Sequence, residues 1–472
     1  MGYPTGGVHA ERVGARRTPD HLHRDLRHIV LEGALTNVFV ILTGGAFVTG
    51  LALFLGAGDF EIAMLAALPL VAQTVQLASG LFDRPLLRKK ISVLGLTIGR
   101  QIWWLVLPLL FLSGDWRLVA FLAVVTLSAF ATMAVAPIWL AWIAGLVPHQ
   151  IRGRFFAARN VGVAVTTLIF SVGASLVLDQ TKATGHEAIG FAVVVFGAVI
   201  ASAIASVVLG RVSYRIDYET KEDYPVTDWF EPLRDPAFRN ILRVFFVWNF
   251  AIGTSAAFFV PHMLLNLKMS FLLIGLYTSY SSLIALTVNR LWGKLIDRFG
   301  SRNVLAVCAT GIGAVPLFWL FVRADFLWLL AIEVTWSAFV WTGFNLAAFT
   351  LPIDKSPRRN RTLYLAWFAA VTGIAFFVAS IAGGLVAELL ADWQWQIGPQ
   401  TLKNYHVLFV ASSVLRFASV GLLFALTQSS EQGVPMMVQL MGYAVLKRLS
   451  LGRQVMPFAV EGMEARNRNN PE

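Results

Sequence analysis

The chain alternates long apolar runs with short polar segments, and the alternation gives twelve apolar runs. The hydrocarbon core of a bilayer is about 30 Å thick, so a helix needs roughly 20 apolar residues to cross it. The pattern therefore predicts twelve membrane-spanning helices. They are expected at residues 34–56, 60–82, 91–113, 117–147, 157–179, 188–210, 238–264, 270–292, 302–323, 326–351, 362–390 and 403–427.

Composition agrees with a membrane protein and excludes a soluble globule. Hydrophobic residues make up 57% of the 472 residues, charged residues make up 14%, and the mean hydropathy is +0.67. Such a chain has too little polar surface to fold in water. Cys308 is the single cysteine and lies in the ninth run, which excludes an intrachain disulfide and a thiolate metal cluster.

Lysine and arginine give the orientation. With both termini inside, cytoplasmic segments hold 31 of the 38 basic residues. Each outer loop holds at most one, and these five are Arg117, Lys182, Lys268, Arg323 and Lys403. The positive-inside rule therefore places both termini in the cytoplasm, with the protein in the inner membrane. The net charge of +11 follows from this topology and implies attraction to anionic lipid rather than to nucleic acid.

Polar segments divide the chain into two halves of six helices with three cytoplasmic segments. From Pro19, apolar residues at helical spacing among charges predict an amphipathic lead-in lying on the membrane surface, and a second such helix is expected after the last span. The first span has no cleavage site and is expected to be retained. The parts are a tail (1–33), the first half (34–210), a linker (211–237), the second half (238–427) and a C-terminal tail (428–472).

The two halves repeat one another. Shifted by 212 residues, Asn37 falls on Asn249 and Thr43 falls on Ser255; later in the chain Pro148 matches Pro352. Two related halves around a central site are the arrangement by which alternating-access transporters work.

Two charged turns carry a family resemblance. Gly293, Asp297, Arg298 and Gly300 fit the Gly-x-x-x-Asp-Arg-x-Gly-Arg-Lys loop of the major facilitator superfamily, and residues 79–90 resemble the first copy of that loop. In the first copy the glycine comes one residue late, and a leucine replaces the second glycine. The resemblance implies an all-α membrane protein of twelve helices in two pseudo-symmetric halves.

The resemblance also implies a cytoplasmic latch, in which aspartates at helix ends pair with arginines of neighbouring loops and hold the halves together. The alternative is that these charges only fix topology. The candidates are Asp83, Arg84, Arg154, Asp297, Arg298 and Arg361.

Charged residues inside the spans are costly unless they are partnered or hydrated, and therefore mark candidate functional sites. Glu333 lies in the tenth span, which in the family lines the central cavity with the first, fourth and seventh; its match in the first half is Ala129. Arg100 and Arg416 lie in outer spans and are expected to brace the helices or to snorkel. Aromatic rings near Glu333 suit a polar solute with an apolar face, although packing or an interfacial belt also explains them. The substrate and coupling candidates are Asn37, Thr43, Asn249, Glu333, Trp336, Ser337 and Trp341.

The leading hypothesis is a monomeric secondary transporter of a small organic solute, coupled to a proton or another ion and surrounded by membrane lipids. One alternative is an exporter of lipidic or drug-like compounds, although the fifth span lacks the Gly-Pro-Gly motif of many such exporters. The other is a non-transporting scaffold or sensor with the same fold. The chain contains no nucleotide loop, zinc-protease motif or serine elbow, so neither an enzyme nor a cofactor or metal site is expected.

Overall fold

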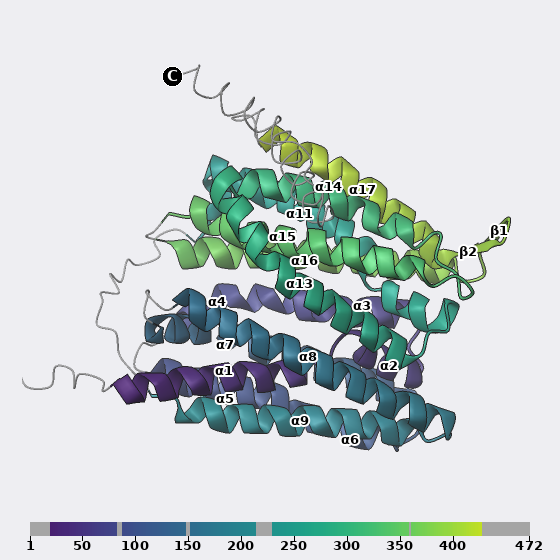
Figure 1. The fold of residues 1–472 in the computed structure, drawn as a ribbon, viewed down its shortest axis with the longest axis horizontal. Helices are drawn as coiled ribbons and strands as arrows, with labels where there is room; N and C mark the ends of the chain where they lie inside the picture. The colour runs from purple at the N-terminus through teal and green to yellow at the C-terminus, as the bar shows by residue number, and fades with distance from the viewer. Residues whose placement is uncertain (1–18, 83–86, 148–151, 214–228, 358–359, 427–472) are drawn as a thin grey trace, which may run out of the picture.

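The computed structural model describes residues 19–82, 87–147, 152–213, 229–357 and 360–426. Twelve helices in it are long and apolar enough to cross a membrane, which confirms the number of spans predicted from the sequence. The first residue of α1 and the last turns of α17 lie at the same end of the bundle, on the left in Figure 1. We call this the tail end and the opposite end the far end.

The first half contains the first six spans, and three of these are interrupted. The first span is α1 (Pro19–Leu42) and α2 (Gly45–Phe54). The second is α3 (Asp59–Val71), η1 (Ala72–Val75) and α4 (Gln76–Phe82), and the third is α5 (Arg88–Gln101), η3 (Ile102–Leu105) and α6 (Val106–Leu109). The others are α7 (Trp116–Leu146), α8 (Arg152–Ala183) and α9 (Glu187–Arg211).

The second half begins after the short helix α10 (Glu231–Arg234). Its first span is α11 (Pro236–Ala256), α12 (Phe259–Pro261) and the π-helical η5 (His262–Asn266). The next four are α13 (Phe271–Phe299), α14 (Ser301–Phe318), α15 (Leu329–Lys355) and α16 (Arg361–Leu389). A hairpin of β1 (Gln394–Ile397) and β2 (Gln400–Lys403) at the far end precedes α17 (Asn404–Leu426).

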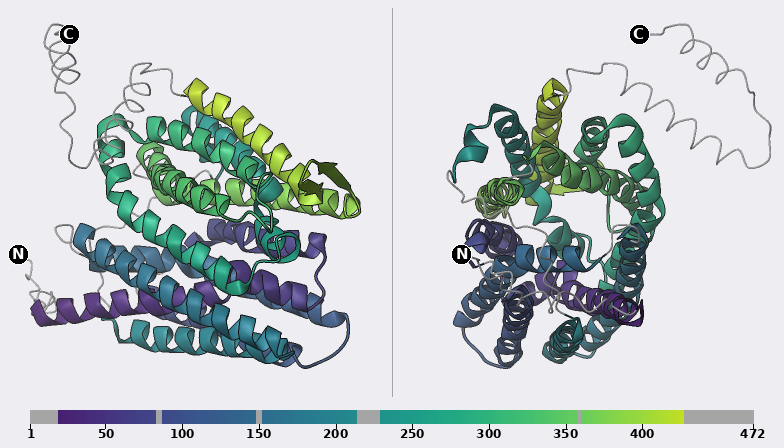
Figure 2. Two further views of the ribbon diagram at one scale, coloured as in Figure 1. Left: turned by 45° about the vertical axis from the view of Figure 1, so that its right-hand side comes forward. Right: turned by 90° about the vertical axis from the view of Figure 1, so that its left-hand side faces the viewer.

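Packing within the halves repeats, as the sequence repeat predicts. In the first half α1 packs on α8 and α9, and α5 packs on α7 and α9. In the second half α11 packs on α16 and α17, and α14 packs on α15 and α17. The halves lie side by side in Figures 1 and 2, where the first is purple to blue and the second is green to yellow. Their main contacts are α3 with α16 and α8 with α13.

The first span of each half breaks within two positions of the point that the repeat makes equivalent. α1 ends at Leu42 and α2 begins at Gly45, whose φ of 51° is left-handed and favours glycine. α11 ends at Ala256 and continues as the short α12. The segments beyond the breaks, α2 and α12, contact each other across the halves at the far end.

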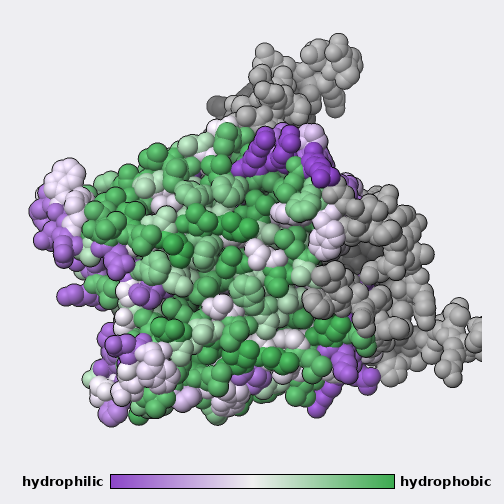
Figure 3. All heavy atoms as spheres, turned by 180° about the vertical axis from the view of Figure 1, so that it is seen from behind, coloured by the Kyte–Doolittle hydropathy of each residue, from purple (hydrophilic) through white to green (hydrophobic). Residues whose placement is uncertain are grey.

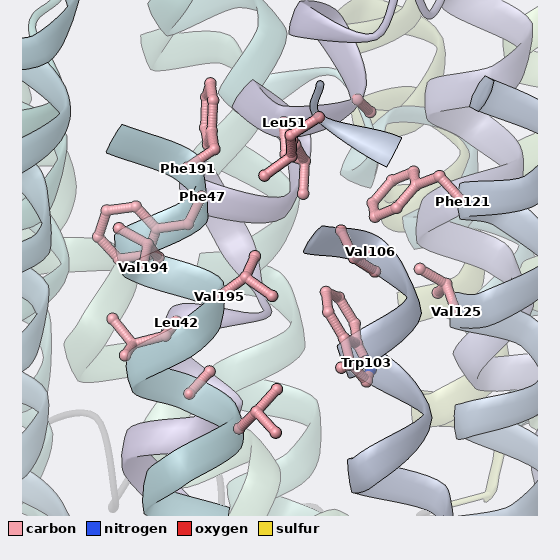
Figure 4. Packing of buried hydrophobic residues seen from close by; sticks show 14 of the residues in the cluster. Leu42, Phe47, Leu51, Trp103, Val106, Phe121, Val125, Phe191, Val194 and Val195 are labelled. Atoms are coloured by element: carbon pink, nitrogen blue, oxygen red, sulfur yellow. The ribbon is translucent and has the colours of Figure 1, made fainter. Parts of the chain in front are cut away.

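Apolar side chains fill each half and also cover its sides. Figure 4 shows the core of the first half, where Trp103 and Phe121 pack edge to face near Leu42, Leu51 and Val195. Figure 3 shows apolar residues over the middle of the bundle and hydrophilic residues towards its ends. This surface is suited to hydrocarbon around the middle and to water at both ends.

Two boundaries differ from the sequence prediction. The expected surface helix before the first span is part of α1, which continues unbroken from Pro19 because Asp25, Ile29 and Glu32 are buried within the half. The second charged turn lies on the last turn of α13, which ends only at Gly300, where φ is 81°. The C-terminal amphipathic helix and most of the linker lie outside the described residues.

Candidate functional site

Glu333 lies inside the second half, in the second turn of α15. Its side chain is only 1% exposed, and its Oε2 accepts a hydrogen bond of 2.8 Å from the hydroxyl of Tyr277 on α13. Trp319, just after α14, and Ser337, one turn further along α15, lie beside the same carboxylate. No lysine or arginine of the described residues forms an ion pair with it. The arrangement is a buried carboxylate that accepts a hydrogen bond from one neutral hydroxyl, away from bulk water.

The two tryptophans predicted beside Glu333 contact different neighbours. Trp336 is 41% exposed and donates from Nε1 to the carbonyl oxygen of Gly311 on α14, at 3.0 Å. Trp341 is half-buried and lies edge-on to Phe344, which stacks on Trp248 of α11. The structure therefore brings Ser337 together with Glu333. It directs Trp336 towards α14, whereas Trp341 packs on the rings that lie towards α11.

The repeated asparagines have different partners. Asn37 donates from Nδ2 to the carbonyl oxygen of Val163 at 3.1 Å and to the hydroxyls of Thr166 and Thr167 at 3.0 and 2.9 Å, which ties α1 to α8. Asn249 donates to the carbonyl oxygen of Phe245 one turn earlier in its own helix, at 2.8 Å. The amide of Asn249 therefore makes no cross-helix bond among the described residues.

Thr43 lies at the break between α1 and α2. Its hydroxyl donates to the carbonyl oxygen of Phe39 at 2.7 Å, and its backbone N–H donates to the same oxygen at 2.9 Å. Both bonds cap the end of α1. No described contact joins Thr43 or Asn37 to Glu333, so the candidates lie in two separate groups, one in each half.

Both intramembrane arginines are buried, which excludes snorkelling and agrees with the bracing role left open by the sequence. Arg100 on α5 lies 3.8 Å from Oε1 of Glu32 on α1. Arg416 on α17 is 2% exposed and donates to the carbonyl oxygen of Ile312 and to the hydroxyl of Ser255, both at 3.3 Å. Each arginine therefore joins helices within one half.

Two carboxylates of the first half hold the second half at the far end. Oδ1 and Oδ2 of Asp179 on α8 accept from the backbone N–H groups of Phe271 and Leu272, both at 2.8 Å. These are among the unpaired donors at the start of α13, where the helix dipole also favours a negative charge. We call this contact and the next one the far-end clamps.

The second far-end clamp lies at the other interface between the halves. Asp59, the first residue of α3, accepts from the hydroxyl of Tyr405 at 2.5 Å and from Nδ2 of Asn404 at 2.9 Å. Each pair of charged or polar groups crosses from one half to the other. The far end of the bundle is therefore closed by hydrogen bonds to two carboxylates.

The structure fully describes three of the six latch candidates, namely Asp297, Arg298 and Arg361. Asp297 and Arg298 are exposed on the last turn of α13, and in the described part of the chain Asp297 makes no ion pair. Arg361 begins α16, and its Nε is buried without a hydrogen-bond partner among the described residues. Asp83 and Arg84 lie outside the described residues, as does the side chain of Arg154.

The sequence analysis missed the partners of these groups. Tyr277, Trp319 and Glu32 lie far from Glu333 and Arg100 in the sequence and act through tertiary contacts. A signal was present for Asp179 and Asp59, because each is a carboxylate within or beside an apolar run near its far end.

The fold and the sequence both match known proteins. The family model described as Major Facilitator Superfamily matches residues 33–352 and 253–435, which together span most of the chain. The chain belongs to the Major Facilitator Superfamily. This confirms the resemblance seen in the two Asp-Arg turns. Membership of this transporter family implies that the chain binds a small-molecule substrate. No curated protein matches the chain significantly.

Solved structures of other superfamily members share the fold at low sequence identity. A crystal structure of the nucleoside transporter NupG has a TM-score of 0.64 at 14% identity, covering 84% of this chain and 99% of that one. The D-xylose-proton symporter has a TM-score of 0.60 at 14% identity, covering 84% and 97%. A bacterial homologue of the iron transporter ferroportin, in an inward-facing state, has a TM-score of 0.60 at 15% identity, covering 87% and 99%.

Proposed function

We propose that this superfamily member is a secondary active transporter that moves a small organic solute by alternating access and couples the movement to protons. The observation that carries the proposal is Glu333, a carboxylate 1% exposed that accepts from Tyr277 and has no basic partner among the described residues. Similarity to a proton symporter and a nucleoside transporter supports the class and does not identify the substrate.

An ionised carboxylate without a cation is costly inside a membrane protein, and a proton removes that cost. Glu333 is therefore suited to carry a proton while the site is closed to water and to release it when one side opens. Tyr277, Trp319 and Ser337 belong to three segments, α13, the end of α14 and α15, so a change in their packing changes the donors around the carboxylate. This links proton occupancy to helix movement.

We further propose that the tail end faces the cytoplasm and that the protein works as a monomer in the inner membrane, in contact with anionic lipid. Lysine and arginine cluster in the segments at the tail end, as the positive-inside rule requires. The far-end clamps would then close the outer side, and Asp297, exposed and without an ion pair in the described residues, would belong to a latch released at the cytoplasmic side.

Replacing Glu333 with glutamine tests the coupling. Glu333→Gln keeps the size of the side chain and mimics its protonated form, so we expect loss of proton-driven accumulation with substrate exchange retained. The measurement is uptake into proteoliposomes with and without an imposed proton gradient, followed by exchange between loaded vesicles. Nucleosides, sugars, amino acids, organic acids and drug-like compounds form the substrate screen.

Glu388→Gln is the matched control, because Glu388 is an exposed glutamate in the last turn of α16. It should accumulate substrate like the unmodified protein. Accumulation against a gradient by Glu333→Gln would contradict coupling at this residue, and loss of exchange as well would make Glu333 a substrate contact. A protein that moves no compound of the screen under either condition would support the scaffold alternative.

A further inference from the structure

A second polar cluster lies in the first half, away from Glu333. It is built from Glu32 and Gly33 on α1, Arg100 on α5, Trp139 on α7 and Arg159 on α8. The guanidinium of Arg159 lies 5.7 Å from the ring centroid of Trp139. Helices α1, α7 and α8 therefore meet around Arg159, and α5 joins the cluster through the pair of Arg100 with Glu32, the residue before Gly33.

Arg159 extends across α1 to reach α7. A Cβ atom added at Gly33 would lie 2.6 Å from Nε and 3.2 Å from Cγ of Arg159, so the glycine makes room for the side chain. Arg159 lies seven residues into α8, which is about 10 Å from the start of the helix. The charge is thus within the bundle rather than in the loop that precedes α8.

Donors in the cluster outnumber acceptors. Nε of Arg159, Nη1 of Arg100 and Nε1 of Trp139 are buried atoms with no hydrogen-bond partner in the described part of the chain. Trp142, one turn along α7, has an unpartnered Nε1 too. The one unpartnered acceptor here is Oε2 of Glu32, whose Oε1 already accepts from Thr36 at 2.7 Å. Because buried donors are normally satisfied, this surplus indicates a missing acceptor.

Charge leads to the same conclusion. Glu32 lies 3.8 Å from Arg100, whereas Arg159 forms no ion pair with any described residue. An arginine presents five N–H donors in a planar fork that matches a carboxylate or a phosphate group. A bound oxyanion would supply both the missing charge and the missing acceptors.

An apolar layer lies on the tail-end side of the cluster, and two of the cluster's side chains are partly exposed. Ile29, Leu96 and Phe155, each four residues before Gly33, Arg100 and Arg159 respectively, belong to one buried apolar cluster with Trp142. Arg159 and Trp139 remain partly exposed. The Arg159 side chain is therefore not sealed inside the bundle, whereas Glu32 and Arg100 are buried.

We propose that Arg159, supported by Trp139 and by the space at Gly33, binds an oxyanion, either a carboxylate or a phosphate ester, carried by the transported solute. This rests on the proposed function, because it names the class of solute that the transporter accepts. An anionic lipid headgroup has the same chemistry and is the alternative source of the oxyanion.

The test is calorimetric titration of the full-length protein in phosphatidylcholine nanodiscs with benzoate, phenyl phosphate and the neutral benzamide. We expect saturable binding of at least one oxyanion and none of benzamide. Arg159→Gln should weaken oxyanion binding about tenfold or more, since a charge-assisted bidentate contact is lost. Arg239→Gln, at an exposed arginine near the start of α11, removes the same charge and should leave binding unchanged.

Gly33→Ala provides a second variant that keeps every charge. Its methyl group would displace the guanidinium, so it should also weaken oxyanion binding, and thermal unfolding shows whether both variants remain folded. Unchanged affinity in both folded variants would overturn the proposal, as would binding of benzamide as tight as that of benzoate or no saturable binding of either oxyanion.

Nanodiscs containing phosphatidylglycerol distinguish the two sources of the oxyanion, a transported solute and a lipid headgroup. If native mass spectrometry shows phosphatidylglycerol retained in an Arg159-dependent manner and neither soluble oxyanion binds, the cluster is a lipid site and the inference about the solute fails. Vesicle exchange distinguishes this inference from the proposed function. Exchange of neutral solutes without oxyanion binding refutes the inference and leaves the transporter standing. Oxyanion binding without exchange of any solute refutes the transporter, and of the inference it leaves only an oxyanion site at Arg159.

Discussion

At the scale of single residues, three ionisable side chains buried within the spans each contact a group on another helix. Glu333, Arg100 and Arg416 are recognisable because each is an ionisable residue within a long apolar run. Tyr277 and Glu32 are not, because a tyrosine near one span and a glutamate at the start of another are common, and only the packing of distant helices brings them together.

Arg416 gives a prediction about stability. Its guanidinium is buried and is held by two hydrogen bonds of 3.3 Å with no carboxylate of the described residues in an ion pair. A buried charge without a counter-ion costs free energy that an apolar side chain of similar length avoids. We therefore expect Arg416→Met to keep or raise the melting temperature in detergent, measured by thermal unfolding.

Arg416→Ala is the comparison, since it leaves a cavity and should destabilise the protein by about 2–5 kcal/mol, as large-to-small substitutions in cores do. If Arg416→Met lowered the melting temperature as much as Arg416→Ala, the hydrogen bonds to Ile312 and Ser255 would outweigh the cost of the charge.

At the scale of elements, hydropathy predicted the number of spans and missed where they break or extend. The first span was expected to start at residue 34, but α1 begins at Pro19 because buried Asp25 bonds to Ser213 after α9, a contact that hydropathy does not register. α13 extends to Phe299 because nothing in its charged last turn opposes a helix, and only Gly300 ends it.

The far-end clamps and the proposed latch should have opposite effects. Asp179→Asn weakens two charge-assisted bonds to α13 and should favour opening of the far end, whereas Asp297→Asn should favour opening of the tail end. A loss of about 1–2 kcal/mol changes a balanced equilibrium about tenfold. The measurement is the rate at which a maleimide reacts with a cysteine at Leu178, which is 2% exposed and lines a far-end pocket of about 190 Å³, in a Cys308→Ala background.

We expect faster labelling at residue 178 with Asp179→Asn and slower labelling with Asp297→Asn. Asp325→Asn is the control, because Asp325 is at the far end and, within the described ranges, forms an ion pair only with the neighbouring Arg323 on the surface. Equal rates in all three variants would leave the aspartates of α8 and α13 without a role in the conformational equilibrium.

At the scale of the whole molecule, the topology can be measured directly. Twelve spans with both termini in the cytoplasm place Thr184 and Gln396 outside, and Thr227, in the linker between the halves, inside. Single cysteines at the first two positions in a Cys308→Ala background should react with an impermeant maleimide added to intact cells, and one at Thr227 should react only after lysis. Reaction of the third before lysis, or failure of the first two, would contradict the orientation.

The internal repeat was the strongest whole-molecule prediction from the sequence, and the packing of both halves agrees with it. The repeat also explains why the site could be predicted only in part. Asn37 and Asn249 occupy matching positions, yet Asn37 joins two helices and Asn249 bonds within its own helix, so a matching position in the repeat did not predict a matching contact.

The interruption of the first span in each half has a consequence for the history of the protein. α1 and α11 end at residues 42 and 256, which the repeat places within two positions of each other. The simplest order of events is that the break existed in a six-helix ancestor that paired with a second copy before the gene duplicated. Glu333, whose counterpart is Ala129, would then have arisen later, in one copy only. Movement at the far end would thus be older than the chemistry that distinguishes the two halves.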